Sequence, residues 1–160
     1  MTEEAMIYEQ MRPEIEAACE GMQMGTELFR FEELTSYSSV YFGSLVVFRI
    51  RCRGKKHYLA VPAKTRDFIP MSLEPYSVKS DEMVRIPMLT DELPPEMVPI
   101  VRPIVEETVK QIGKEFDCCS RCEECSDAGV CVRRDFRSYQ CGYRKILREG
   151  RIFFGRNRNV

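Results

Sequence analysis

The sequence predicts an α+β fold with an N-terminal helix, a small antiparallel sheet with a helix packed on it, and a small C-terminal zinc-binding module. Three observations predict it. Apolar residues recur at helical spacing near both ends of residues 1–116, and segments rich in Val, Ile, Phe and Tyr lie between them. Six cysteines then fall within the 24 residues 118–141. We therefore divide the chain into an α+β domain at 1–116 and a cysteine-rich zinc-binding module at 117–160.

The first predicted helix begins after Thr2, whose hydroxyl is a suitable N-cap. It ends at Gly21 or Gly25, and Pro13 is expected to kink it or to split it into two. Residues 26–34 are predicted to form a short second helix. The apolar face of the first helix consists of Ile7, Met11, Ile15, Ala18 and Met22. Its acids indicate a solvated face or, alternatively, a mimic of nucleic-acid phosphates: Glu3, Glu4, Glu9, Glu14, Glu16 and Glu20.

The centre of the chain predicts strands. Residues 45–53 and 56–62 are expected to pair as a β-hairpin, because the Arg53-Gly54-Lys55 segment between them suits a tight turn. Residues 83–88 predict a further strand, and Pro87 near its end indicates an edge position.

A last helix is expected from about Pro103 to Lys114. Pro99 and Pro103 leave the position of its start open, because proline removes a backbone donor. Its apolar stripe consists of Val101, Ile104, Val105, Val109 and Ile112.

Charge alternates in blocks along the 160 residues although the formal net charge is only -1. The net charge is -7 over 1–36, +6 over 37–73, -5 over 74–117 and +5 over 118–160. Such blocks produce polar faces that can steer partners. The N-terminus lacks the basic and apolar regions of a signal peptide, and no apolar run approaches ~20 residues. We expect a soluble cytoplasmic protein, in which clustered cysteines indicate metal or redox chemistry rather than disulfides.

The cysteine cluster is expected to hold one structural metal ion, Zn²⁺, in a closed site without a catalytic water. A module of about 40 residues has too little core to be stable alone, so a metal would supply stability. An iron–sulfur cluster also uses four thiolates, and free thiols without metal are the remaining alternative. The favoured ligands are Cys119, Cys125, Cys131 and Cys141, with Cys122 as the rival to Cys119 or Cys125 and Cys118 as a spare.

The segments CCSRCEECSDAGVC (118–131) and CGYRKILREGRIFFGRNRNV (141–160) carry a family resemblance. They resemble a C-terminal module of uncharacterised proteins of phages and mobile elements, chiefly from Firmicutes. The resemblance supports the ligand set Cys119, Cys125, Cys131 and Cys141, whereas Cys122 departs from the pattern. Proteins of such elements often antagonise host defences. The resemblance therefore implies an anti-CRISPR protein that acts in the bacterial host cell.

Two basic segments are candidate nucleic-acid surfaces. Arg49, Arg51 and Arg53 alternate along one predicted strand, so they share a face at ~6.6 Å intervals, close to the phosphate spacing of a nucleic-acid strand. Lys55 and Lys56 extend this patch. The solvated face of a half-exposed sheet is the alternative interpretation. The C-terminal tail adds Arg144, Lys145, Arg148, Arg151, Arg156 and Arg158, interleaved with aromatic residues that can stack on bases or form a small core.

Enzyme motifs are missing from the sequence. His57 is the single histidine, and we expect it to be a partly exposed or hydrogen-bonded sheet residue. No phosphate-binding loop and no His-x-Glu deaminase signature occurs. We therefore expect a non-enzymatic protein that binds nucleic acid or a nucleoprotein complex, most concretely a CRISPR–Cas effector. A zinc-containing DNA-binding regulator is the first alternative, and a metal- or iron–sulfur-dependent nucleic-acid enzyme is the second.

Elemental analysis tests the predicted site of the module. The purified full chain should carry about one equivalent of zinc at the cluster, because four thiolates saturate a tetrahedral ion. A coloured preparation that contains iron would indicate that the site holds an iron–sulfur cluster instead of zinc. A protein that contains neither metal, with every thiol open to titration, would contradict the prediction.

Overall fold

The computed structural model describes residues 1–22, 26, 29–42, 45–79 and 81–115, with side chains up to residue 110, and the backbone of two short strands. The predicted α+β class is confirmed: two long helices accompany a six-stranded antiparallel sheet. The two short strands, β7 (Val130–Cys131) and β8 (Phe136–Arg137), pair antiparallel with each other. The rest of the predicted zinc-binding module lies outside the described residues.

Helix α1 spans Glu3–Gly21 and confirms the predicted N-cap, because Thr2 Oγ1 accepts a hydrogen bond from the Ala5 N–H at 3.1 Å. Of the two outcomes expected at Pro13, a kink or a split, the split is wrong, since one helix continues through this residue. Pro13 lies on the exposed side, where water can satisfy the carbonyl that its missing N–H leaves free. The predicted apolar face is buried at Ile7, Met11, Ile15 and Ala18, and Met22 is partly buried.

The sheet has the strand order β1-β2-β3-β4-β6-β5, and every neighbouring pair is antiparallel. The strands are β1 (Phe29–Glu33), β2 (Ser38–Phe42), β3 (Leu45–Arg53), β4 (Lys56–Pro62), β5 (Tyr76–Ser77) and β6 (Met83–Pro87). The strands from β1 to β4 are neighbours both in sequence and in space, which is a simple up-and-down arrangement.

Strand β1 corrects the helix predicted at 26–34. Phe29 and Phe31 alternate with the exposed Arg30, so this segment has the two-residue period of a strand. Phe31 stacks on Tyr8 of α1 with ring centroids 5.0 Å apart. Pairing with β2 and this contact with the helix stabilise the strand against its local helical signal.

The predicted β-hairpin is confirmed, because β3 and β4 begin and end at the residues predicted for its two strands. Gly54 has φ +61° in the turn, a conformation that other residues seldom adopt. This turn sets the register that places Arg53 opposite Lys56 and Cys52 opposite His57. From Phe48 to Arg53 the side chains of β3 therefore alternate between the two faces of the sheet, whereas a register shift against β2 at Val47 buries both Val47 and Phe48 in the main core.

Strand β6 confirms the strand predicted at 83–88, but its predicted edge position is wrong. It lies between β4 and β5. Strand β5 pairs only with Val84 and Arg85, so Pro87 lies beyond the covered part of β6. A proline is tolerated at this point because its missing N–H interrupts no pairing with β5.

Helix α2 spans Val98–Glu115, so it begins five residues before the predicted start at Pro103. The short 3-10 helix η4 (Pro95–Met97) leads into it, and two further 3-10 helices, η2 (Ala63–Phe68) and η3 (Met71–Leu73), follow β4. The predicted stripe is buried at Val101, Ile104, Val105 and Val109, whereas the side chain of Ile112 lies outside the described part of the chain. No helix in the described part of the chain has both the length and the apolar character needed to span a membrane.

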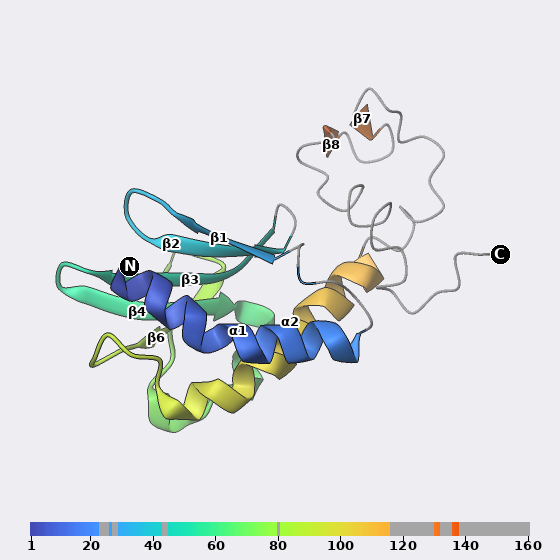
Figure 1. Cartoon of the computed structure of the whole chain (residues 1–160). Coiled ribbons are helices and arrows are strands. Elements are labelled where there is room, and N and C mark those ends of the chain that lie inside the picture. The colour runs from blue at the N-terminus through green and yellow to red at the C-terminus, as the bar shows by residue number, and fades with distance from the viewer. Residues whose placement is uncertain are drawn as a thin grey trace.

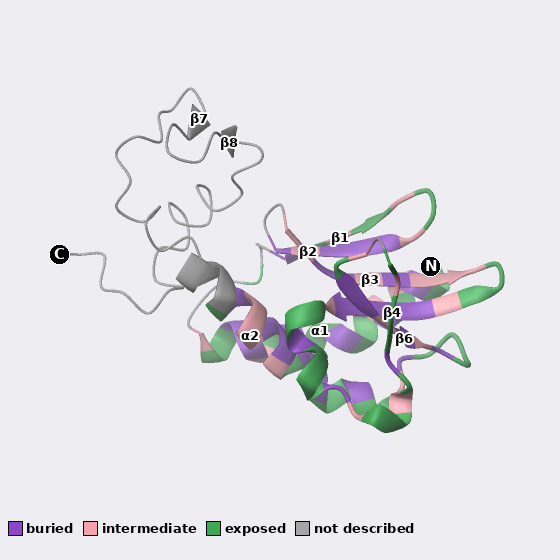
Figure 2. Ribbon diagram, turned by 180° about the vertical axis from the view of Figure 1, so that it is seen from behind, coloured by how far each residue is buried: buried purple, intermediate pink, exposed green. Residues whose placement is uncertain are grey.

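Both helices lie on one face of the sheet (Figure 1), and the main core fills the space between helices and strands. Figure 2 shows the buried residues concentrated on the strands and on one side of each helix. The opposite face, which we call the outer face, carries a small second cluster of described residues that contains Tyr58, Ala60 and Met83. Charged side chains have to cover most of that outer face.

The carboxylate of Glu4 is buried within this layer arrangement, with 2% of the residue exposed. The prediction of a fully solvated acidic helix face is therefore wrong at this position. Glu4 Oε1 accepts hydrogen bonds from Ser38 Oγ and from Arg53 Nη2 at 2.7 Å. Glu4 Oε2 accepts from the Cys52 N–H at 2.8 Å and from Arg53 Nε at 3.0 Å. Four donors from two strands thus converge on one side chain of α1.

The position of Glu4 follows from the unequal lengths of β2 and β3. Pairing between these strands stops at Ser38 opposite Ile50, whereas β3 continues to Arg53. The Cys52 N–H would be left without a strand partner on that side, and Glu4 accepts its hydrogen bond instead. Arg53 also donates to the carbonyls of Leu34 and Thr35, both at 2.6 Å, and so ties the β1–β2 turn to the same point.

Burial raises the pKa of the Glu4 carboxyl, but hydrogen bonds from Ser38, Arg53 and the Cys52 amide, with the charge of Arg53, outweigh it. The pKa therefore lies below the ordinary value of 4.5. The folded protein holds this carboxyl as a carboxylate at neutral pH.

Replacing Glu4 by Gln should lower the free energy of unfolding by about 3 kcal/mol, because Arg53 and the Cys52 amide lose a charged acceptor. Urea denaturation at pH 7 measures this change. The matched control is Glu3→Gln, which makes the same charge change at the exposed neighbouring position and should cost less than about 1 kcal/mol. Equal effects of the two substitutions would contradict the role assigned to Glu4.

The same carboxyl makes stability depend on pH. Since the folded pKa of Glu4 lies below the unfolded value, its contribution is present above pH 4.5 and is lost as pH falls through the folded pKa. The stability of the wild type should therefore fall more steeply below pH 4.5 than that of the Glu4→Gln variant. Parallel pH profiles would show that Glu4 is not the group responsible.

Candidate nucleic-acid interface

Arginine side chains stack on tyrosine rings on the outer face of the sheet. Three guanidinium groups lie over tyrosine rings, which fixes each arginine close to the sheet. The pairs, with distances from Cζ to the ring centroid, are Arg30 over Tyr41 at 4.1 Å, Arg85 over Tyr58 at 4.2 Å and Arg49 over Tyr37 at 5.1 Å. The outer face is thus rich in cations that are already ordered.

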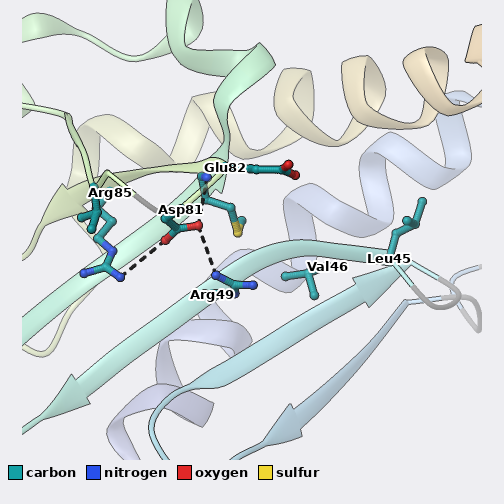
Figure 3. A pocket seen from close by; sticks show the side chains of 8 residues that line it. Leu45, Val46, Arg49, Asp81, Glu82 and Arg85 are labelled. Carbon is teal, nitrogen blue, oxygen red and sulfur yellow. Dashed lines mark hydrogen bonds and ion pairs between the residues drawn. The ribbon is translucent and has the colours of Figure 1, made fainter.

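A first hollow lies on this face between β3 and β6 (Figure 3). Its volume is about 660 Å³. Apolar residues and charged residues both line it: Leu45, Val46, Arg49, Val78, Asp81, Glu82, Met83 and Arg85. Figure 3 shows Asp81 between the two arginines.

Asp81 organises the charges of this hollow. Its Oδ1 lies 3.3 Å from Arg49 Nη1, and its Oδ2 lies 3.4 Å from Arg85 Nη2. Its Oδ1 also accepts a hydrogen bond from the Met83 N–H at 3.0 Å, which fixes the carboxylate relative to β6. One carboxylate therefore holds two arginines and leaves this group of three side chains with a net positive charge.

Donors exceed acceptors on the outer face. The Nε atoms of Arg49, Arg51 and Arg85 are buried and have no hydrogen-bond partner among the described residues. Asp81 contacts a terminal nitrogen, not the Nε, of each of its two arginines. These Nε atoms are too buried to reach a ligand, so an anion on this face would be attracted by the positive charge of the guanidinium groups as a whole.

A second hollow, of about 550 Å³, adjoins the first and shares Val78 and Arg85 with it. Lys55 and Lys56 line it, as do the 39% exposed Tyr76 and the fully exposed Leu89. Together we call the two hollows the outer groove. Its basic side chains come from β3, the hairpin turn, β4 and β6, and Tyr76 adds an aromatic ring that can stack on a base.

The structure separates the three arginines predicted to form one basic row. Arg49 lines the outer groove and pairs with Asp81. Arg51 is half-buried, and its Nε is buried without a partner among the described residues. Arg53 bends at the end of β3 and binds Glu4, so it adds little free charge to the surface. Lys55 and Lys56, by contrast, are exposed and line the groove.

Sequence reasoning missed Arg85, Asp81 and Tyr76. The alternation in Met83–Pro87 does place Arg85 on the face opposite Val84 and Ile86. Its place beside Arg49 depends on the pairing of β6 with β4, which no local pattern reveals. The predicted cysteine ligands and the tail arginines lie outside the described residues, apart from the backbone of Cys131 in β7.

Removing the Asp81 carboxylate should lower the free energy of unfolding by about 2 kcal/mol, because two arginines and the Met83 N–H lose their charged acceptor. Asp81→Ala tests this by urea denaturation. The control Asp67→Ala removes an exposed acid from η2 and should change stability by less than about 0.5 kcal/mol. Similar losses in both variants would show that Asp81 does not hold the arginines.

No protein-family model, curated protein or solved structure matches the chain.

Proposed function

We propose that the protein is a non-enzymatic binding protein that recognises a nucleic acid or a nucleoprotein complex through the outer groove and the C-terminal module. One observation carries the proposal. Four basic side chains (Arg49, Lys55, Lys56 and Arg85) line the groove, against two acids, Asp81 and Glu82. Phosphates are the anions that such a spread of cations along a sheet suits.

The remaining groove residues favour a single strand. Tyr76 is partly exposed beside Lys55 and Lys56, so that a base can stack while the adjoining phosphates contact the lysines. Arg49 and Arg85 are held close to the sheet by Asp81, and little conformational entropy is lost when they bind. Contacts of this type recognise charge and shape more than base sequence.

The C-terminal segment gives the proposal its most concrete form. Its resemblance to modules of phage and mobile-element proteins supports inhibition of a host CRISPR–Cas effector. Zinc at Cys119, Cys125, Cys131 and Cys141 would then fold the module that presents the tail arginines. A guide-loaded effector offers both basic channels and nucleic acid, so the groove and the module need not share one target surface.

Replacing Lys55 and Lys56 together by Gln should weaken binding to a fluorescent single-stranded oligonucleotide by roughly tenfold or more at moderate salt, because two phosphate contacts are lost. The slope of log K against log salt should become shallower by about 1.4, at about 0.7 for each contact on a single strand. Fluorescence anisotropy over a salt series measures both quantities. The control Lys64→Gln with Lys110→Gln makes the same charge change at exposed positions in η2 and α2, outside the groove residues.

The wild type and the two double variants should also be tested against a guide-loaded CRISPR effector. If the wild type binds the effector but not bare nucleic acid, and the Lys55 and Lys56 variant loses this binding, the result supports recognition of a nucleoprotein complex. Binding to bare DNA with the same loss favours a DNA-binding regulator. Equal behaviour of the two double variants on every target would overturn the role of the groove.

A further inference from the structure

A second group of polar side chains lies at the open end of the core, near the N-terminus of α1 and the tip of the β3–β4 hairpin. The sulfur of Cys52, a ring nitrogen of His57 and a carboxylate oxygen of Asp91 all lie within 4.8 Å of one another. His57 also lines the second hollow of the outer groove. Cys52 and Asp91 have no part in the proposed nucleic-acid surface, so this group requires a separate explanation.

Backbone pairing brings the three residues together. Cys52 and His57 are direct partners in the β3–β4 register, so their side chains leave the same face of the sheet. Asp91 follows β6, and its loop is fastened on both sides. The Met88 N–H donates to the His57 carbonyl, and the Leu93 N–H donates to Gln10 Oε1 of α1, both at 2.9 Å. The three donor atoms are thus placed by strand register and by two loop anchors.

The hydrogen bonds of His57 point to a cation. Its Nε2 lies 3.0 Å from the Gly54 carbonyl oxygen, which can only accept, so Nε2 carries a proton. Its Nδ1 lies 2.9 Å from Asp91 Oδ1, which also accepts. In a neutral ring the lone pair of Nδ1 would then face a carboxylate. Either a second proton on the ring or a metal ion held by both atoms removes this repulsion, and a backbone carbonyl on the other nitrogen is the usual support of a metal-bound histidine.

Cys52 brings its sulfur to this group from the buried side. It packs against the main core, whereas Asp91 approaches from the exposed side. Binding of a metal ion would displace the proton of the Cys52 thiol.

The donor set selects the class of ion. One sulfur, one imidazole nitrogen and one carboxylate oxygen suit a borderline transition metal such as Zn²⁺, whereas Ca²⁺ and Mg²⁺ prefer sites made of oxygen alone. Three protein ligands leave a tetrahedral ion with one further position. Asp91 is 46% exposed and His57 is 28% exposed, so that position faces solvent.

We propose that Cys52 Sγ, His57 Nδ1 and a carboxylate oxygen of Asp91 bind one Zn²⁺-class ion, with the fourth coordination position open to solvent. This site is additional to the zinc expected at the cysteine cluster of the C-terminal module. It fastens the tip of the β3–β4 hairpin to the loop that follows β6, and it does not depend on the proposed binding of nucleic acid.

Titration of the metal-free full chain with Co²⁺ tests the proposal, with absorption spectra and elemental analysis as readouts. Cobalt at the C-terminal cysteines gives a signal common to all variants. The wild type should bind one Co²⁺ more than Cys52→Ser and His57→Ala, and the charge-transfer absorption from the Cys52 sulfur should vanish in Cys52→Ser. Asp91→Asn should weaken binding of this additional ion at least tenfold.

Glu92→Gln is the matched control, because it makes the same charge change as Asp91→Asn at the next exposed position of the loop. It should retain the additional Co²⁺. Circular dichroism identifies any variant that fails to fold, and Asp91→Asn, in an exposed loop, then decides the outcome. The proposal is overturned if Asp91→Asn and Glu92→Gln bind the same number of cobalt ions with equal affinity and identical spectra.

Discussion

The buried ion pair between Glu4 and Arg53 is the interaction on which the arrangement of this protein depends. It joins the first turn of α1, the end of β3, the first residue of β2 and the β1–β2 turn. A buried carboxylate is costly unless donors surround it, and here four donors do so. Strand β3 can therefore extend beyond β2 without leaving its Cys52 amide unsatisfied.

This ion pair also determines which cations remain on the surface. Because Arg53 turns toward Glu4, the outer groove takes its charge from Arg49, Arg85 and the two lysines of the hairpin. The Cys52 amide is fixed by the same carboxylate, which holds the Cys52 side chain opposite His57. One contact on the helix side thus connects the two candidate sites, the outer groove and the group of Cys52, His57 and Asp91, and His57 belongs to both.

Local patterns predicted much of this fold. Alternation and Gly54 predicted both strands of the central hairpin, and apolar spacing predicted both helices and the buried side of each. The helix predicted at 26–34 was wrong because only two phenylalanines mark β1, and contacts with Tyr8 and β2 decide its structure.

Long-range pairing decided the remaining features. The burial of Glu4 depends on where β2 ends relative to β3. The position of Arg85 in the groove, beside Arg49 and in contact with Asp81, depends on the order of the strands. Charge patterning along β3 predicted a basic row of three arginines, but it could not show that one of them has a partner 49 residues away in the sequence. The predicted module at 117–160 remains a prediction from its cysteines and its resemblance.

A double-mutant cycle on Glu4 and Arg53 tests the central claim most directly. The free energy of unfolding would be measured for the wild type, Glu4→Gln, Arg53→Gln and the double variant. If this ion pair organises the fold, the two substitutions should couple by about 1–3 kcal/mol, with the double variant less destabilised than the sum of the single variants. Additive effects, with coupling near zero, would show that the two residues stabilise the protein independently and would contradict the account.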